Sequence, residues 1–283
     1  MSKIKITCDS TCDLTAELYR RCNADVIPLG VLLGDELRHD GVDVTVRELY
    51  DYVAKTGVLP KTSAISQFEY ASVWKPYLEE GYSIIHINIS SAISACHQNA
   101  RMAAAELKNV YPVDSLSLSS GSGMLVLKAA ELAEQGLEAP EIAKELERLR
   151  GLLDVSFVLQ TLEYLQKGGR CSSVLAFGAN LLKLRPEIVL QPDGSMDVGK
   201  KYRGSAEKSI IDYVHGRLKG RDDIDKSLIF VVNTYADPQT VEEVKRIVKE
   251  EYGFETVYAA EAGSTISSHC GAGTLGIMFY KKA

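Results

Sequence analysis

YSIIHINISSAISACHQNARMAAAEL, residues 82–107, decides the fold class of this 283-residue chain. Its first part, 83–90, is a run of apolar and β-branched residues that predicts a buried strand. A helical pattern over 92–107 follows at once. A strand that ends in hydroxyl side chains and passes directly into a helix is typical of an open α/β sheet, where ligands bind at the carboxyl edge of the strands.

The residues before this stretch show the same alternation. Strands are expected at 3–10 and 24–33, and helices at 15–22, 46–57 and 68–81. Gly57 and Gly81 follow two of the helical patterns, and glycine is suited to end a helix because it tolerates the left-handed conformation. This alternation predicts a first domain with a largely parallel sheet flanked by helices.

The length of the chain fits two domains or one large α/β domain, and the pattern changes near residue 153. An amphipathic helix after Pro140 closes the first half, with Ile142, Leu146 and Leu149 on one face. Beyond it we expect strands at 155–162, 227–235, 254–261 and 275–280, helices at 163–184, 205–218 and 238–253, and a hairpin at 187–204. The prediction is two α/β domains, residues 1–153 and 154–283.

Composition narrows the possible partners. A net charge of -6 and a pI near 5.5 argue against a general affinity for nucleic acid or an anionic membrane. The sequence shows neither a signal-peptide pattern nor an apolar run long enough to span a membrane, so we expect a cytoplasmic protein. Its six cysteines contain no C-x-x-C pair, which predicts neither disulfides nor a zinc site.

Two glycine patterns imitate phosphate-binding motifs. GAGTLG at 271–276 has the G-x-G-x-x-G spacing, but a strand-like segment follows where a nucleotide-binding fold needs a helix. GSMDVGKK at 194–201 has Lys201 where the Walker motif needs serine or threonine, and it follows a turn. We therefore interpret the first as a turn that positions His269 and reject the second.

Hydroxyl side chains gather in three short segments where strands should end. They are DSTCD at 9–13, TSAIS at 62–66 and SSAIS at 90–94. The third stands before a helix, whose free N–H groups and positive partial charge favour an anionic ligand. The same serines can instead serve as helix caps, and the sequence leaves both possibilities open.

Several segments together resemble the DegV family of two-domain bacterial fatty-acid-binding proteins. The segments, in chain order, are DSTCDL, TSAIS, SSAISACHQ, VDSLSLSSGSG, YLQKGGR, the DG turn with KYRG, and HCGAG. They cover nearly the whole chain. The resemblance implies a long-chain fatty acid in a tunnel between the two domains, with no metal and no cofactor. It implies that the carboxylate is held by Thr62, Ser63, Ser94 and His269.

The resemblance also implies that ligand binding and phosphorylation are carried out by separate proteins. Members of the family present the bound carboxylate to a separate ATP-dependent kinase subunit, which forms the acyl phosphate, so the chain itself is expected not to be an enzyme. By similarity, Arg170 and Arg203 lie near the tunnel entrance and face the kinase. Candidate tunnel-lining residues are Ile65, Ile93, Phe157, Leu159, Leu175, Phe177 and Leu181.

Two other functions stay open on the residues alone. The first is a serine hydrolase in which Ser94 or Ser63 is the nucleophile and His269 the base, although no acidic orienting residue can be placed. The second is a phosphocarrier that acts through His269. The resemblance favours the fatty-acid carrier over both.

Overall fold

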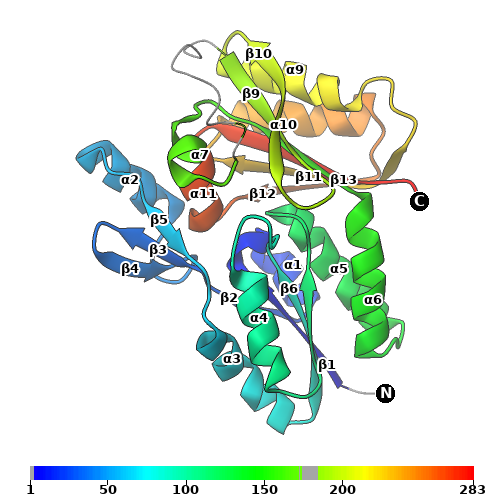
Figure 1. Ribbon diagram of the computed structural model, residues 1–283. Coiled ribbons are helices and arrows are strands. Elements are labelled where there is room, and N and C mark those ends of the chain that lie inside the picture. Colours follow the sequence, from blue (N-terminus) through cyan, green and yellow to red (C-terminus); the bar gives the residue numbers. More distant parts are fainter. Residues whose placement is uncertain (1–2, 172, 174–183) are drawn as a thin grey trace.

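The computed structural model describes residues 3–171, 173 and 184–283. Within them the chain forms two larger sheets and one small one, each covered by helices (Figure 1). The first sheet lies in the lower lobe of Figure 1, the second in the upper lobe, and the small sheet projects to one side of the junction. The expected α/β fold is confirmed.

The first sheet has the strand order β2-β1-β6-β7 and is parallel throughout, as the sequence predicted. Its strands are β1 (Lys3–Asp9), β2 (Ala24–Ile27), β6 (Tyr82–Asn88) and β7 (Val110–Asp114). Its helices are α1 (Ala16–Arg21), α3 (Gln67–Glu79), α4 (Cys96–Ala105), α5 (Ser120–Glu134) and α6 (Ala139–Leu149). Two short 3-10 turns, η1 (Ser10–Cys12) and η2 (Arg150–Leu152), follow β1 and α6.

The small antiparallel sheet was not predicted. It has the order β4-β3-β5, from β3 (Gly30–Leu33), β4 (Glu36–His39) and β5 (Lys61–Ser63), and α2 (Val46–Thr56) precedes β5. The sequence predicted one strand over 24–33, but this segment is divided between β2 and β3. The division falls at Pro28, which has no N–H to donate to a sheet. The segment therefore leaves the first sheet and starts another.

The second sheet has six strands in the order β10-β9-β8-β13-β11-β12. These are β8 (Leu153–Val158), β9 (Leu184–Leu190), β10 (Met196–Arg203), β11 (Ile224–Thr234), β12 (Thr256–Glu261) and β13 (Thr274–Lys281). All its pairings are antiparallel except that of β11 with β12. The expected hairpin is β9–β10. The division of the chain at residue 153 into two independent domains stays a prediction.

The helices of the second half depart from the prediction in two places. Among the described residues, these helices are α7 (Glu163–Gly168), α9 (Ala206–Leu218), α10 (Pro238–Arg246) with the π-helical turn η4 (Ile247–Glu251), and α11 (Ser264–Cys270). The single helix expected over 163–184 is wrong, because α7 ends at Gly168 and Gly169 is left-handed, with a φ of 68°. The helix α11, which is only two turns long, was not predicted from the sequence.

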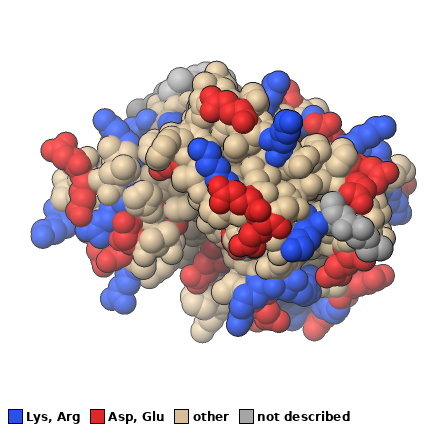
Figure 2. Space-filling model, turned by 90° about the horizontal axis from the view of Figure 1, so that it is seen from below, with Lys and Arg blue, Asp and Glu red and all other residues tan. Residues whose placement is uncertain are grey.

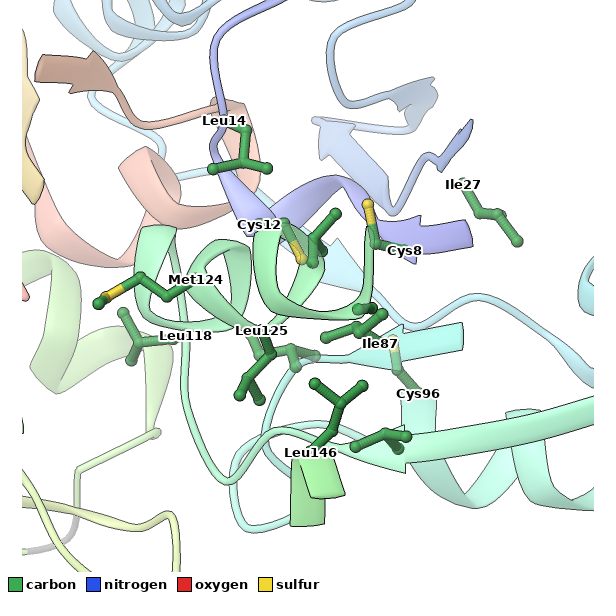
Figure 3. Close-up of a cluster of buried hydrophobic side chains, with 14 of the residues drawn as sticks. Cys8, Cys12, Leu14, Ile27, Ile87, Cys96, Leu118, Met124, Leu125 and Leu146 are labelled. Carbon is green, nitrogen blue, oxygen red and sulfur yellow. The ribbon is translucent and has the colours of Figure 1, made fainter. Parts of the chain in front are cut away.

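The largest apolar cluster fills the first lobe and continues into the second sheet. Figure 3 shows part of it, with Cys8, Cys12, Leu125 and Leu146 packed around β1 and α5. All six cysteines are buried free thiols. Across the described residues, no helix combines the length and the apolar character needed to cross a bilayer. Figure 2 shows acidic and basic side chains interspersed over the face seen from below.

A buried carboxylate fixes the end of β6. Asp9 is fully buried at the end of β1, where its Oδ2 accepts a hydrogen bond of 2.9 Å from the backbone N–H of Ile89. Its Oδ1 accepts one of 2.7 Å from Tyr70 and contacts His86 Nε2 at 3.1 Å. Because every partner is itself buried, this network holds the segment after β6 in one position. That segment leads into the site.

Candidate functional site

A cavity of about 270 Å³ is lined by residues from the small sheet, the second sheet, α7 and α11, and from the segments that follow β2 and β6. Apolar side chains make up most of its wall: Leu29, Ile89, Ile93, Leu118, Phe157, Leu165, Met196 and Ile266. The polar and charged side chains in the wall are Thr62, Ser63, Ser94, Arg170, Thr265 and His269. An apolar cavity with a few converging hydroxyl groups is suited to an amphipathic ligand.

Thr62 and His269 meet at this cavity although 207 positions separate them in the sequence. Thr62 Oγ1 lies 2.8 Å from His269 Nε2. Thr62 comes from β5 and His269 from the last turn of α11, so the contact joins the small sheet to the second lobe. Although part of the imidazole faces the cavity, burial lowers the pKa of His269 to about 4, and the charge of Arg170 adds to this. The ring is therefore neutral near pH 7.

A neutral imidazole has one donor and one acceptor, and its surroundings indicate how they are used. His269 Nδ1 is buried and has no hydrogen-bond partner among the described residues. Gly168 lies against it, since a methyl group there would be 2.3 Å from Nδ1. If Nε2–H donates to Thr62 Oγ1, the hydroxyl proton of Thr62 is free to point into the cavity. This tautomer suits an anionic ligand.

Ser63 and Ser94 line the same cavity. Ser63 lies opposite Gly30 in the β3–β5 pairing, and a methyl group on Gly30 would be 2.1 Å from Ser63 Oγ. A side chain at position 30 would therefore force Ser63 Oγ and the Leu37 side chain to move. Ser94 Oγ accepts a hydrogen bond of 3.2 Å from the N–H of Cys96, which leaves its own proton available as a donor.

The turn around Ser94 explains why α4 begins late. The sequence predicted a helix from residue 92, but the N–H groups of Ile93 and Ser94 both bond the carbonyl of Ser90, and α4 starts at Cys96. The N-cap of α4 is Ala95, and no side chain caps the helix there, so the serines do not act as the helix caps that one alternative required. Ser94 lies just before the helix and lines the cavity.

Thr265 is a cavity residue that the sequence did not suggest. It lies one turn before His269 on α11, and its Oγ1 is buried without a hydrogen-bond partner in the described part of the chain. The i, i+4 spacing to His269 was the only available signal. It could be recognised only after the short helix was known.

The expected tunnel-lining residues separate into three groups. Ile93 and Phe157 line the cavity. Ile65 and Leu159 are buried in the main apolar cluster and are absent from the cavity wall. Leu175, Phe177 and Leu181 lie outside the described residues.

The two arginines lie in different places. Arg170 lines the cavity while remaining exposed, and its Nη1 donates to the carbonyl of Gly168 at 2.6 Å. Arg203 is exposed at the end of β10 and is not part of the cavity wall. Their suggested part in binding a partner stays a prediction.

The glycine-rich stretch that follows His269 is a turn. Gly271 ends α11, Gly273 has a φ of 80°, and Gly276 lies in β13, where a methyl group would be 2.8 Å from the carbonyl of Ser156. The stretch connects a helix to an antiparallel strand, which is the reverse of a nucleotide-binding loop. The interpretation as a turn is confirmed.

The geometry gives little support to a serine hydrolase. Within the described residues, neither Ser63 nor Ser94 bonds His269, and no carboxylate contacts its imidazole. A hydrolase needs a serine on one ring nitrogen and an orienting group on the other. Here threonine contacts one nitrogen, and the other has no partner in the described part of the chain.

Comparisons with known proteins agree on one family. The family model described as "Uncharacterised protein, DegV family" matches residues 3–282. A DegV domain-containing protein of Clostridium acetobutylicum is 30% identical over 100% of both chains. Another, from Clostridium perfringens, is 35% identical over 72% of this chain and 74% of its own length.

Two solved structures are similar over almost their full length. A DegV family protein from Thermus thermophilus, described by its fatty acid binding, has a TM-score of 0.86 and 33% identity, covering 99% of each chain. DegV from Bacillus subtilis, described as a fatty acid binding protein, has a TM-score of 0.84 and 29% identity, covering 100% of each chain.

Proposed function

The chain belongs to the DegV family, and we propose that it binds a long-chain fatty acid with the carboxylate at Thr62 and His269. The single observation that carries this proposal is the 2.8 Å contact between these two neutral groups at the wall of an apolar cavity. The similar proteins from Thermus thermophilus and Bacillus subtilis are described as binding fatty acids. Both lines of support point to the same ligand class.

Burial of the alkyl chain supplies the driving force. Each methylene removed from water contributes about 0.8 kcal/mol, so a long chain gains on the order of 10 kcal/mol before the loss of its motion is subtracted. The carboxylate opposes binding, since an unpaired charge in an apolar site costs several kcal/mol. Hydrogen bonds from the hydroxyls of Thr62, Ser63 and Ser94 would offset this cost. Thr265 Oγ1, which has no partner in the described chain, would be a fourth donor.

The chain would act as a carrier and not as an enzyme. Neutral donors hold a carboxylate without the salt bridge that lysine would form, so the oxygen atoms stay available for phosphoryl transfer. A separate ATP-dependent kinase would carry out that transfer. Arg170, exposed at the cavity wall, would face the kinase, and Arg203 would contribute to docking from β10. Arginine suits this role because it forms paired hydrogen bonds with acidic surfaces.

The test is to identify the ligand that the protein carries. Native mass spectrometry of freshly purified protein should show one fatty acid per chain, and solvent extraction should release the free acid. A delipidated sample should take up the same acid again. Protein that purifies empty and does not bind added fatty acids would overturn the proposal.

Replacing Gly168 by alanine should weaken fatty-acid binding roughly 5- to 150-fold, the equivalent of about 1–3 kcal/mol. The new methyl group would lie 2.3 Å from His269 Nδ1, so the imidazole would have to move away from Thr62. Gly151→Ala is the matched control, because a methyl group there meets no atom within 4 Å. Affinity is measured by displacement of a fluorescent fatty acid. Equal affinities for the two variants would show that His269 does not hold the head group.

A further inference from the structure

The first turn of α11 is held by carboxylates from elsewhere in the chain. Asp13 Oδ1 accepts a hydrogen bond of 2.8 Å from the N–H of Gly263, and Asp40 Oδ1 accepts one of 2.6 Å from the N–H of Ser264. The helix has no side-chain cap of its own. These two acids come from the first lobe and the small sheet, whereas α11 belongs to the second lobe (Figure 1). They therefore fix the helix that carries Thr265 and His269.

The two carboxylates are close together and almost inaccessible to solvent. Asp13 is 5% exposed and Asp40 3%. A methyl group at Gly263 would lie 2.9 Å from Asp40 Oδ1 and 3.3 Å from Asp13 Oδ1, so both acids approach the same point of the backbone. The remaining oxygens accept from hydroxyls, Asp13 Oδ2 from Ser119 at 2.6 Å and Asp40 Oδ2 from Ser10 at 3.0 Å.

No cation of the described chain forms an ion pair with either acid. The titratable groups that face Asp13 are Asp40, Cys12, Tyr19 and Cys270. Asp40 borders an open hollow together with Asp43 and Glu48, and His39 contacts Asp43 at 3.4 Å. Burial raises the pKa of Asp13 to about 7, and the charge of Asp40 acts in the same direction, against hydrogen bonds from Ser119 and Gly263.

We infer that Asp13 and Asp40 are positioning residues that hold α11 through a single shared negative charge, and that they thereby set the distance of His269 from the ligand carboxylate. This role rests on the proposed fatty-acid binding. With one proton on Asp13 Oδ2, that oxygen can donate to Ser119 while Oδ1 still accepts from Gly263. Loss of the proton places two buried negative charges at one turn of helix, which favours a displaced α11.

The sign of the pH dependence follows from the raised pKa. The folded protein keeps a proton on Asp13 that the unfolded chain has already released, so this group stabilises the fold at low pH. Its contribution falls as pH rises from about 4 towards 7. Above the midpoint, the affinity for a fatty acid should fall by up to about tenfold for each pH unit, because one proton is involved.

The ligand and His269 do not obscure this effect. A carboxylic acid in water is already ionised above about pH 5. The pKa of His269, about 4, leaves its imidazole neutral over the same range. A decline in affinity as the pH rises through the raised pKa of Asp13, about 7, thus reports on the acid pair.

The experiment compares the wild-type protein with Asp13→Asn, Asp40→Asn and Asp43→Asn. Fatty-acid affinity and the thermal unfolding of ligand-free protein are both measured across the pH range. Asp13→Asn keeps the acceptor for Gly263 and a donor for Ser119 without a charge, so its affinity should be independent of pH. Asp40→Asn should move the decline to lower pH or reduce it. Asp43→Asn, which changes an exposed acid of the same hollow, should keep the wild-type profile.

Parallel pH profiles for the wild type and Asp13→Asn would overturn the inference. If Asp13→Asn does not fold, the shift caused by Asp40→Asn decides the question in its place. If none of the proteins binds a fatty acid at any pH, the proposed function fails, and the unfolding data decide separately whether the pair holds α11. In that case the melting temperature of Asp13→Asn should increase relative to that of the wild type as pH rises towards 7. A constant difference between the two melting temperatures would contradict the inference.

Discussion

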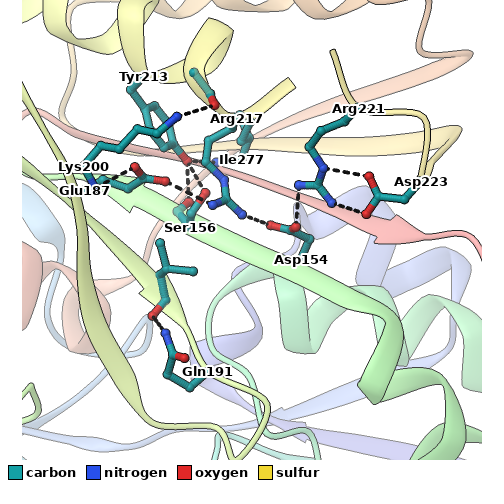
Figure 4. Close-up of polar contacts among 12 residues, drawn as sticks. Asp154, Ser156, Glu187, Gln191, Lys200, Tyr213, Arg217, Arg221, Asp223 and Ile277 are labelled. Carbon is teal, nitrogen blue, oxygen red and sulfur yellow. Dashed lines mark hydrogen bonds and ion pairs between the residues drawn. The ribbon is translucent and has the colours of Figure 1, made fainter. Parts of the chain in front are cut away.

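Replacing Asp154 by alanine is expected to lower the free energy of unfolding by about 3 kcal/mol. Asp154 stands on β8, where one oxygen pairs with Arg217 and the other with Arg221 Nη1 at 2.7 Å (Figure 4). The side chains of Asp154 and Arg217 are 10% and 17% exposed. Removal of one partner of a buried ion pair costs about 3–5 kcal/mol because the other charge is left uncompensated. We expect the lower end of this range, because Arg217 still forms an ion pair with Glu187 at 3.2 Å.

Asp223→Ala is the matched control for this prediction. Asp223 also pairs with Arg221, through two hydrogen bonds of 2.8 and 2.6 Å, but its side chain is 48% exposed. Exposed pairs contribute about 0–1 kcal/mol, so this variant should unfold near the wild-type denaturant concentration. Both variants are compared by urea unfolding. Equal losses of unfolding free energy in the two variants would show that burial does not set the strength of these ion pairs.

The network also bears on the cavity. Arg217 lies on α9 and Asp154 on β8, so their pairing fixes this helix against the sheet. Phe157, three residues along β8, lines the cavity. Loss of Asp154 therefore loosens one wall of the site as well as the fold. Weaker ligand binding should accompany the lower stability.

The sequence predicted the elements whose signal is local. The strand at β6 and the hydroxyls that follow it were recognised because one short stretch contains both the apolar run and the helical pattern. The small sheet could not be found in this way. Its strands β3 and β5 are separated by α2, and the close approach of Ser63 to Gly30 becomes visible only when the two strands are paired.

The same reasoning applies to the site. The pairing of Thr62 with His269 joins residues 207 positions apart, and it was suggested by the family resemblance and not by a local pattern. Asp13 was recognised only as part of the hydroxyl-rich segment at 9–13, and Asp40 was not singled out, since nothing in the sequence connects them to the helix at 264–270. Contacts between lobes depend on tertiary packing, which neither composition nor periodicity encodes.

Replacing Thr62 by valine should weaken fatty-acid binding roughly 5- to 150-fold, or about 1–3 kcal/mol. Valine keeps the shape of threonine but removes the hydroxyl that contacts His269 Nε2 at 2.8 Å. The imidazole is then left without its partner, and the carboxylate loses a donor. Thr62→Ser retains the hydroxyl and should bind nearly as well as the wild type. Affinities are compared by displacement of a fluorescent fatty acid.

A fatty alcohol of the same chain length separates the contribution of the head group to binding from that of the alkyl chain. Its binding should change little in Thr62→Val, because the alcohol carries no charge that needs a donor in the apolar wall. The double variant Thr62→Val/His269→Ala should bind the acid about as weakly as the worse single variant, since His269 acts through the Thr62 hydroxyl. Strictly additive losses would mean that the two residues contact the carboxylate independently. Equal losses for acid and alcohol would place the head group elsewhere in the cavity.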